Sequence, residues 1–162
     1  MYDRPEGAAD IHRKLKGEPL KMMKVCPLCD AIYDEHRWVP EPDGALRKKA
    51  ARRKPPSEKC PGDLRIERKQ VEGVVTLNGA FLELHRDELM NLVNRVARKG
   101  RSRNVAARLM NITENDHVVV IETTDDHLAE RIGKEVEKAF KGELVIKWQE
   151  KDRFVRVTWT RE

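Results

Sequence analysis

Apolar residues in the second half of the chain recur with the spacing of strands. Residues 74–84 are rich in β-branched and apolar side chains, and Asn78 and Gly79 within them predict a strand broken by a turn or bulge. Residues 118–123 form a nearly continuous apolar run, which predicts a strand buried on both faces. Two alternating segments around a polar turn at residues 149–152 predict a hairpin. Its apolar positions are Leu144, Ile146 and Trp148 on one strand and Val155, Val157 and Trp159 on the other.

Two further segments show the 3.6-residue period of amphipathic helices. The first apolar stripe comprises Leu89, Leu92, Val93, Val96 and Ala97, and the second comprises Leu128, Ile132, Val136, Ala139 and Phe140. Asp87 and Glu88 suit the first turn of the first helix, and Gly100 can end it. Residues 105–110 predict a further helical piece. Asp125 or Asp126 is expected to cap the second helix.

The order of these elements predicts an α+β fold. Residues 71–162 are expected to form a small sheet covered on one side by two main helices. Residues 21–70 are expected to form a small zinc-ribbon-like module. Within it, residues 40–56 contain few large apolar side chains and many charges, so we expect a basic loop there. Residues 1–20 are expected to be disordered or loosely ordered.

Positive charge is concentrated in two segments. Hydrophobic residues make up 39% of the chain and charged residues 38%, and the net charge is +5. The segments 47–54 and 95–108 each contribute +6, so the remainder is net negative. Such concentration is typical of a phosphate-binding surface. The candidate RNA-binding residues are Arg47, Lys48, Lys49, Arg52, Arg53 and Lys54 in the first segment and Arg95, Arg98, Lys99, Arg101 and Arg103 in the second.

The sequence also excludes several classes of protein. The first residues are polar, no apolar run approaches the length of a membrane span, and the three cysteines suit a reducing compartment, so we expect a cytoplasmic protein. No glycine-rich phosphate loop or nucleophile paired with a base is visible, so no enzymatic activity and no small-molecule substrate are expected. The acids of residues 123–127 are explained by capping of a helix.

Two short knuckles carry the candidate metal ligands. Cys26 and Cys29 are separated by two residues, and Cys60 and Asp63 repeat that spacing. In both knuckles a proline follows the first cysteine, which suits a tight turn. Structural zinc takes four ligands, usually sulfur or imidazole but also carboxylate oxygen. The sequence therefore predicts a zinc site made by Cys26, Cys29, Cys60 and Asp63.

The residues leave alternatives open at this site. His36 is a rival fourth ligand, and His12 is a weaker one. The site is either a zinc site, a degenerate site without metal, or a redox pair formed by Cys26 and Cys29. A redox pair is disfavoured because the motif does not follow a strand and open a helix, as in thioredoxin-like proteins. Tyr33 and Trp38 either fill the small core of this module or stack on a splayed base.

Several segments resemble a family of small bacterial proteins related to the archaeal and eukaryotic large-ribosomal-subunit export adaptor. The segments that carry the resemblance are the two knuckles, Arg37-Trp38, Arg65-Ile66, and residues 75–81, 85–89, 123–133, 140–144 and 156–159. The most distinctive of them begins with Thr123-Thr124-Asp125-Asp126-His127. Members of the family usually have cysteine at the position of Asp63.

The resemblance implies a zinc-binding N-terminal part and a role linked to RNA or the ribosome. The larger adaptors bind the large ribosomal subunit, so the implied partners are ribosomal RNA, the large subunit and ribosomal proteins. Together with the basic segments, this predicts a non-enzymatic, ribosome-associated RNA-binding factor that acts in subunit assembly or binds inactive subunits. The alternative is a metal-stapled protein–protein adaptor without direct RNA contact.

Overall fold

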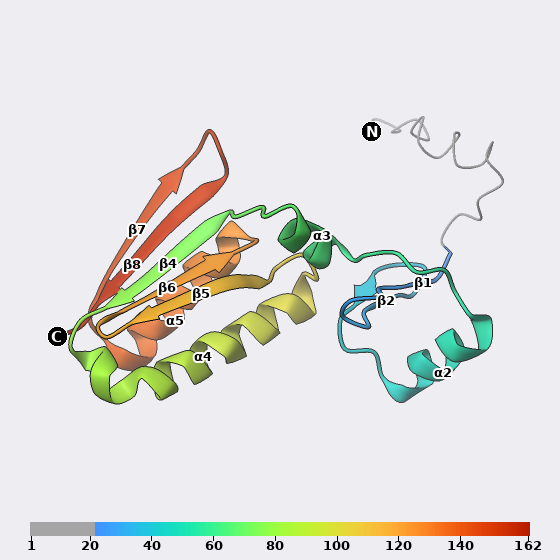
Figure 1. The fold of residues 1–162 in the computed structure, drawn as a ribbon, viewed down its shortest axis with the longest axis horizontal. Helices are drawn as coiled ribbons and strands as arrows, with labels where there is room; N and C mark the ends of the chain where they lie inside the picture. The colour runs from blue at the N-terminus through green and yellow to red at the C-terminus, as the bar shows by residue number, and fades with distance from the viewer. Residues whose placement is uncertain (1–21) are drawn as a thin grey trace, which may run out of the picture. The chain divides into compact units, whose positions relative to one another are not determined.

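The computed structural model describes residues 22–162, which form two compact units. The first unit ends at Glu58 and the second comprises Lys59–Glu162, and each is described by itself (Figure 1). The described chain contains four helices and two sheets, which confirms the predicted α+β class. The expectation of disorder for residues 1–20 lies outside the described residues.

The first unit is built on a three-stranded antiparallel sheet. The strands are β1 (Lys24–Val25), β2 (Ile32–Tyr33) and β3 (Trp38–Val39), in that spatial order. The buried residues Met23, Ile32 and Ala50 form its small core, and Val25 and Leu46 pack against them. Further along the chain, Ser57 forms an isolated parallel bridge with Val25. With so few apolar residues, the core of this unit is small.

Residues 40–56 were expected to form a loop, and this prediction is wrong because they contain helix α2 (Gly44–Arg53). The Asp43 side chain caps the helix by accepting a hydrogen bond from Leu46 N at 2.8 Å. Leu46 and Ala50 are one turn apart and both contact the core of the unit. Two apolar positions, an N-cap and good helix formers are therefore enough to form a helix within a highly charged segment.

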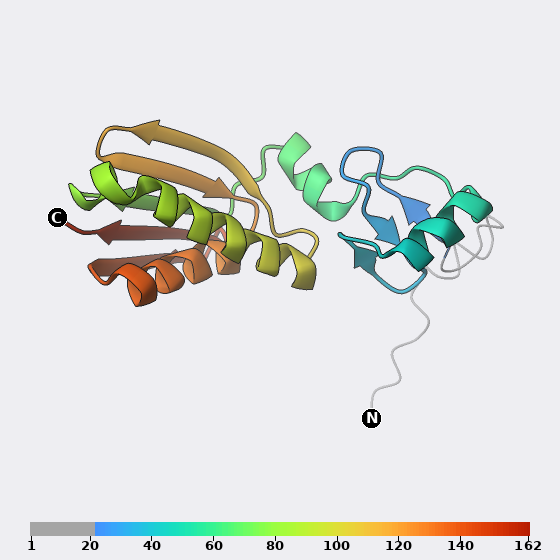
Figure 2. The same ribbon diagram turned by 90° about the horizontal axis from the view of Figure 1, so that it is seen from below.

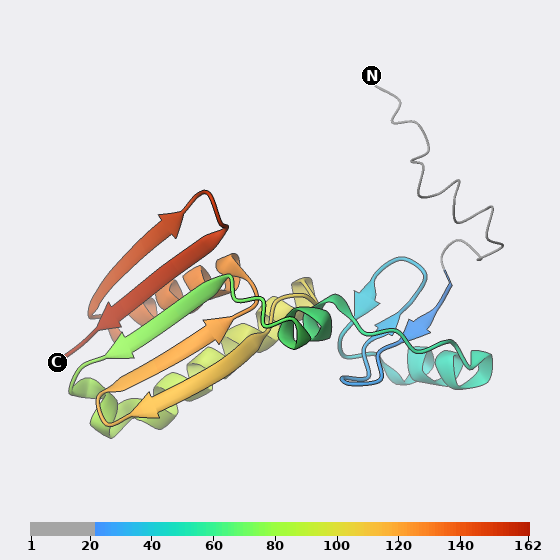
Figure 3. The same ribbon diagram turned by 45° about the horizontal axis from the view of Figure 1, so that its top comes forward.

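The second unit has a five-stranded sheet in the order β5-β6-β4-β8-β7 (Figure 3). Its elements are α3 (Pro61–Glu67), β4 (Gly73–Asn78), α4 (Phe81–Arg103), β5 (Leu109–Asn115), β6 (Val118–Thr123), α5 (Asp126–Phe140), β7 (Glu143–Gln149) and β8 (Phe154–Thr160). Strand β4 is central, antiparallel to β6 and parallel to β8. Helices α4 and α5 lie side by side on one face of this sheet (Figures 1 and 2). The predicted sheet with two covering helices is therefore confirmed.

Helix α4 is longer than the sequence suggested. It begins at Phe81 rather than near Asp87, and it continues past Gly100 to Arg103. Gly100 is buried, and a Cβ atom there would lie 3.1 Å from Leu128 Cδ1. This glycine therefore allows α4 and α5 to approach each other closely, and it does not end the helix.

The predicted helical piece at residues 105–110 is also absent, because these residues form a loop and the start of β5. The Asn104 side chain accepts a hydrogen bond from Ala106 N at 3.0 Å and holds the loop. Ala106 and Ala107 are buried by tertiary contacts rather than on a helical stripe. Strand β5 is an edge strand with mostly exposed, polar residues. Its sequence therefore lacks the alternation of apolar and polar residues from which a strand is predicted.

Trp159 is the largest fully buried side chain of the second unit. Its indole N–H donates a hydrogen bond to Lys141 O, which satisfies the polar atom inside the core. Trp148 lies in the same row as Leu144 and Ile146 and is paired with the buried Val155, yet it is 44% exposed. No helix in the range 22–162 offers an apolar stretch long enough to cross a lipid bilayer.

Replacing Gly133 by alanine is expected to destabilise the second unit. A Cβ atom at this buried position of α5 would lie 2.3 Å from Val157 Cγ1 and 3.0 Å from Leu144 Cδ1. Overpacking of this kind costs about 1–3 kcal/mol of unfolding free energy, which urea denaturation followed by circular dichroism would measure. Gly44→Ala is the matched control, because no atom lies within 4 Å of its added Cβ. An undiminished stability of Gly133→Ala would contradict this packing of α5 on β8.

Candidate metal centre

The first knuckle is a tight loop between β1 and β2. Cys26 directly follows β1, and its backbone N–H donates to Ala31 O at 2.8 Å, which closes the loop. Asp30 adopts a left-handed conformation, with φ of 60°, where the chain turns back toward β2. Cys26 is buried and Cys29 is half-buried. The loop therefore keeps one thiol from solvent and leaves the other partly accessible.

The second knuckle is the start of helix α3. Cys60 is its N-cap residue, and its Sγ accepts a contact from Asp63 N at 3.5 Å. Pro61 occupies the first helical turn, where its missing N–H costs nothing. Sγ of Cys60 and Oδ2 of Asp63 are 3.1 Å apart, and both residues are buried. The two-residue spacing thus becomes one helical turn that presents a sulfur and an oxygen together.

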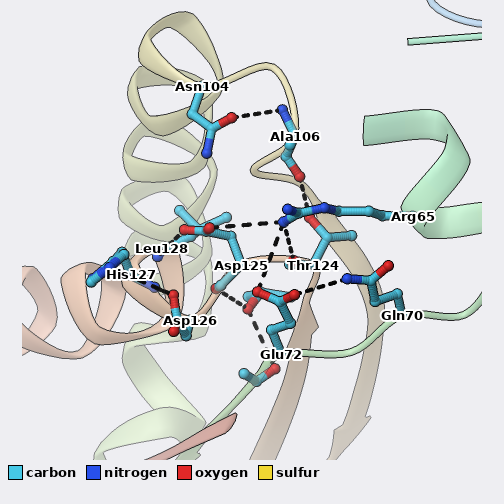
Figure 4. Close-up of polar contacts among 12 residues, drawn as sticks. Arg65, Gln70, Glu72, Asn104, Ala106, Thr124, Asp125, Asp126, His127 and Leu128 are labelled. Carbon is cyan, nitrogen blue, oxygen red and sulfur yellow. Dashed lines mark hydrogen bonds and ion pairs between the residues drawn. The ribbon is translucent and has the colours of Figure 1, made fainter. Parts of the chain in front are cut away.

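Helix α3 is held in place by contacts within the second unit. A Cβ atom on Gly62 would lie 2.4 Å from Val105 O, so only glycine allows the helix to approach this loop so closely. Arg65 donates to Thr124 O at 2.9 Å (Figure 4). Arg108 Nη1 lies 3.4 Å from Asp63 Oδ1. Three contacts therefore fix the helix that carries Cys60 and Asp63.

The four predicted ligands form a group that could hold a metal ion. Each of Cys26, Cys29, Cys60 and Asp63 offers one atom, and these atoms all lie within 4.8 Å of one another. Tetrahedral coordination with metal–sulfur bonds of about 2.3 Å places sulfurs about 3.8 Å apart, so the observed spacing fits. One hydrogen bond helps to bring the two knuckles together. Glu58 N donates to Val25 O at 3.0 Å, which places the chain beside β1 shortly before Cys60.

The rival ligands proposed from the sequence do not belong to this group. His36 is exposed in the turn between β2 and β3, and its side chain is not among the clustered ligand atoms. His12 lies outside the described residues. Asp63 is therefore the fourth member of the candidate ligand set that the structure brings together.

Comparison with known proteins adds nothing to this geometry: no protein-family model, no curated protein and no solved structure matches the chain.

Arg108 would offset part of the negative charge of three thiolates and a carboxylate bound to a metal ion. A divalent ion would leave such a set with two surplus negative charges, and a cation beside the carboxylate offsets one of them. The Arg108 contact to Oδ1 leaves Oδ2 turned toward Cys60, so the guanidinium also orients the carboxylate. In the sequence, Arg108 is recognisable only as part of a basic stretch. Its buried partner, Asp63, is seen only in the tertiary structure.

A second acidic group, made by Glu72, Asp125 and Asp126, also has the spacing of metal ligands. Arg65 already lies within it, with Nη1 at 3.8 Å from Glu72 and 3.9 Å from Asp125 (Figure 4). Asp125 accepts a hydrogen bond from Leu128 N at 3.0 Å and caps α5, as predicted. These acids therefore have structural partners, and we do not assign a metal site to this group.

The Thr123–Asp126 segment is held by its own hydroxyls. Thr124 is buried, donates to Ala106 O at 2.6 Å and accepts from Arg108 N at 2.8 Å. Thr123 donates to Asp125 O at 2.7 Å. This motif thus braces the loop that carries Arg108, which is a role that the sequence pattern alone did not reveal.

The basic residues occupy two helices. Helix α2 carries Arg47, Lys48, Lys49, Arg52 and Arg53, with Lys54 as its C-cap, and the last turns of α4 carry Arg95, Arg98, Lys99, Arg101 and Arg103. All are exposed except Lys49 and Arg101, which are half-buried. Arg53 forms an ion pair with Glu35 at 2.8 Å, and Arg47 Nε donates to Pro42 O at 2.9 Å. The remaining cations of α2 have no ion pair recorded among the described residues.

Replacing Arg108 by methionine is expected to weaken metal binding by about 10- to 100-fold, because the Asp63 carboxylate loses the partner that orients it. Competition with a chromophoric chelator would measure the dissociation constant. Arg68→Met, an exposed position at the end of α3, is the control and should leave affinity unchanged. Equal affinities of Arg108→Met and wild type would contradict this role.

Proposed function

We propose that this protein is a non-enzymatic RNA-binding factor of the large ribosomal subunit, with a zinc ion bound by Cys26, Cys29, Cys60 and Asp63. The observation that carries the proposal is the exposed set of cations on helix α2, in a small unit that also contributes two of the candidate metal ligands. Such a surface suits a polyanion better than a protein partner of mixed charge.

The choice of zinc follows from the donor atoms. Three thiolates and one carboxylate oxygen match the soft and borderline ligands that zinc accepts in closed tetrahedral sites. Hard cations such as Mg²⁺ or Ca²⁺ prefer oxygen ligands alone. When bound, the ion supplies structural stabilisation to the knuckles, and Arg108 orients the weakest ligand of the set.

The helical form of the basic segment favours phosphate contact. Leu46 and Ala50 face the core, so helical periodicity directs Lys48 and Arg52 toward the opposite side of α2. These two cations are one turn apart, with Cβ atoms about 5–6 Å from each other. A helix formed before binding holds them at this spacing, and the entropy cost of ordering a flexible arm on the RNA is reduced.

The second basic segment supports the same proposal independently. Arg95, Arg98, Lys99 and Arg103 are exposed in the last turns of α4, where cations also interact favourably with the helix dipole. The dipole explains cations in the last turn, but Arg95 lies two turns earlier and needs another reason. A phosphate-binding surface provides one.

The assignment to the large ribosomal subunit rests on the sequence resemblance, and the charge distribution supports RNA binding more generally. A sedimentation experiment distinguishes RNA contact from the alternative of a protein adaptor. Association with the subunit that nuclease and high salt abolish supports RNA contact, whereas association that survives both favours a protein adaptor.

Replacing Lys48 and Arg52 together by glutamine is expected to weaken RNA binding and to lower the salt dependence of log affinity by about two, roughly one for each lost phosphate contact. Fluorescence anisotropy of a labelled ribosomal RNA fragment over a series of salt concentrations would measure both quantities.

The matched control replaces Arg131 and Lys138 by glutamine, because both are exposed cations of α5 outside the two basic segments. Its affinity and salt slope should equal those of the wild type. If the Lys48/Arg52 variant also keeps the wild-type slope, α2 is not the phosphate-binding element.

A further inference from the structure

Two aromatic side chains lie on the face of the small sheet that is turned away from its core. The strand register places Lys24, Tyr33 and Trp38 in one cross-strand row and Val25, Ile32 and Val39 in the next. Successive side chains of a strand point to opposite faces of the sheet. Since Val25 and Ile32 pack with α2 in the core of the unit, Tyr33 and Trp38 project from the other face.

The two rings are half-buried and touch each other. Their centroids are 5.7 Å apart and their planes are inclined by 52°. Neither ring belongs to the core that residues 22–58 form in the first unit. The structure therefore favours the second of the two roles considered for them from the sequence, because rings that filled the core would lie on the side of Ile32.

The turn that joins the two rings is rigidly held. Asp34 Oδ1 accepts hydrogen bonds from Arg37 N at 2.9 Å and from His36 N at 3.0 Å. The bond from Arg37 N is the main cause that lowers the pKa of Asp34 below its usual value. Both aromatic residues therefore flank a fixed turn, which reduces the entropy cost of binding a flat ligand.

Three cations lie on the elements around this aromatic pair, and two of them, Lys24 and Arg53, form ion pairs with Glu58 and Glu35. Lys24 Nζ lies 6.0 Å from the centroid of Tyr33, and Arg37 is exposed in the turn. The ion pair between Arg53 and Glu35 at 2.8 Å brings the basic end of α2 to the same turn. The exposed Arg37 and the half-buried aromatic pair thus occur together on the β2–β3 hairpin of the first unit.

We propose that Tyr33 and Trp38 form a stacking platform for an unpaired nucleobase of single-stranded RNA. The inference rests on the proposed function, because it takes RNA as the ligand of this unit, and the exposed Arg37 of the same hairpin would contact a phosphate next to the stacked base. Stacking on an aromatic ring contributes about 1–3 kcal/mol per base and tolerates any base, since every base has a π-face. The platform therefore adds a preference for unpaired RNA over duplex RNA, which the cations alone do not supply.

The test compares a labelled single-stranded RNA of ten uridines with an RNA duplex of equal length, at one salt concentration. Trp38→Ala is expected to weaken binding of the single strand by about 5- to 100-fold, the ratio that corresponds to the loss of one stacked base. Binding of the duplex should be unchanged. Trp38→Phe keeps an aromatic ring and should retain most of the affinity.

Trp148→Phe is the matched control, because Trp148 is also partly exposed, at 44%, and lies in the second unit. Fluorescence provides a readout that does not depend on the alanine variant being folded. Quenching of tryptophan emission by the single strand should persist in Trp148→Phe and disappear in Trp38→Phe. Metal content and circular dichroism show whether each variant retains its structure.

The outcomes distinguish this inference from the proposed function. Wild-type protein that binds neither RNA overturns both. Wild-type protein that binds both RNAs, with the same affinity in Trp38→Ala and the same quenching in Trp38→Phe, overturns the platform and leaves the phosphate-binding role of α2 intact.

Discussion

The seating of helix α3 is the constraint on which the candidate metal centre depends. This helix has only seven residues, so its own hydrogen bonds contribute little to its position. Gly62 lets it approach the backbone at Val105, Arg65 binds the carbonyl of Thr124, and Arg108 binds Asp63. All three contacts reach residues far along the chain. A ligand pair that is local in sequence is thus fixed by the tertiary structure of the α+β domain.

The two units differ in how they can be stabilised. The second unit has a continuous core that extends through its sheet and both covering helices, and Trp159 is its largest fully buried side chain. In the first unit, the core formed by residues 22–58 comprises three buried residues and two partly buried ones. Domains with such small cores usually need a disulfide or a metal ion to remain folded. A metal ion bound through Cys26 and Cys29 would meet this need, and it would hold the loop that precedes the aromatic hairpin.

Much of the fold followed from periodicity. The strands of the hairpin and the α5 stripe were predictable because burial on one face leaves a repeating pattern. The strand at residues 118–123 was also predicted, but its side chains alternate between buried and partly exposed and are not buried on both faces. The Asp125 cap followed from the preference for acidic residues at the start of a helix. The two elements that the sequence analysis missed, β5 and α2, were missed for the same reason. Strand β5 lies at an edge with few buried residues, and α2 buries only Leu46 and Ala50, so neither left a clear period. The four ligands could be predicted because their spacing reflects coordination chemistry, whereas the Arg108 contact joins positions 45 residues apart.

The central position of strand β4 has a consequence for the order of folding. Gly73 is paired on one side with Thr123 and on the other with Val155, so both neighbours of this strand are distant in sequence. Strand β4 is synthesised before both of its partners, so its backbone groups can pair only after β6 and β8 have been made. Pairings of this range slow folding, because a long loop has to close before the strands gain contacts. The α+β domain should therefore acquire its sheet late, after its hairpin has been translated, while the small β1–β3 sheet can form early from neighbouring residues.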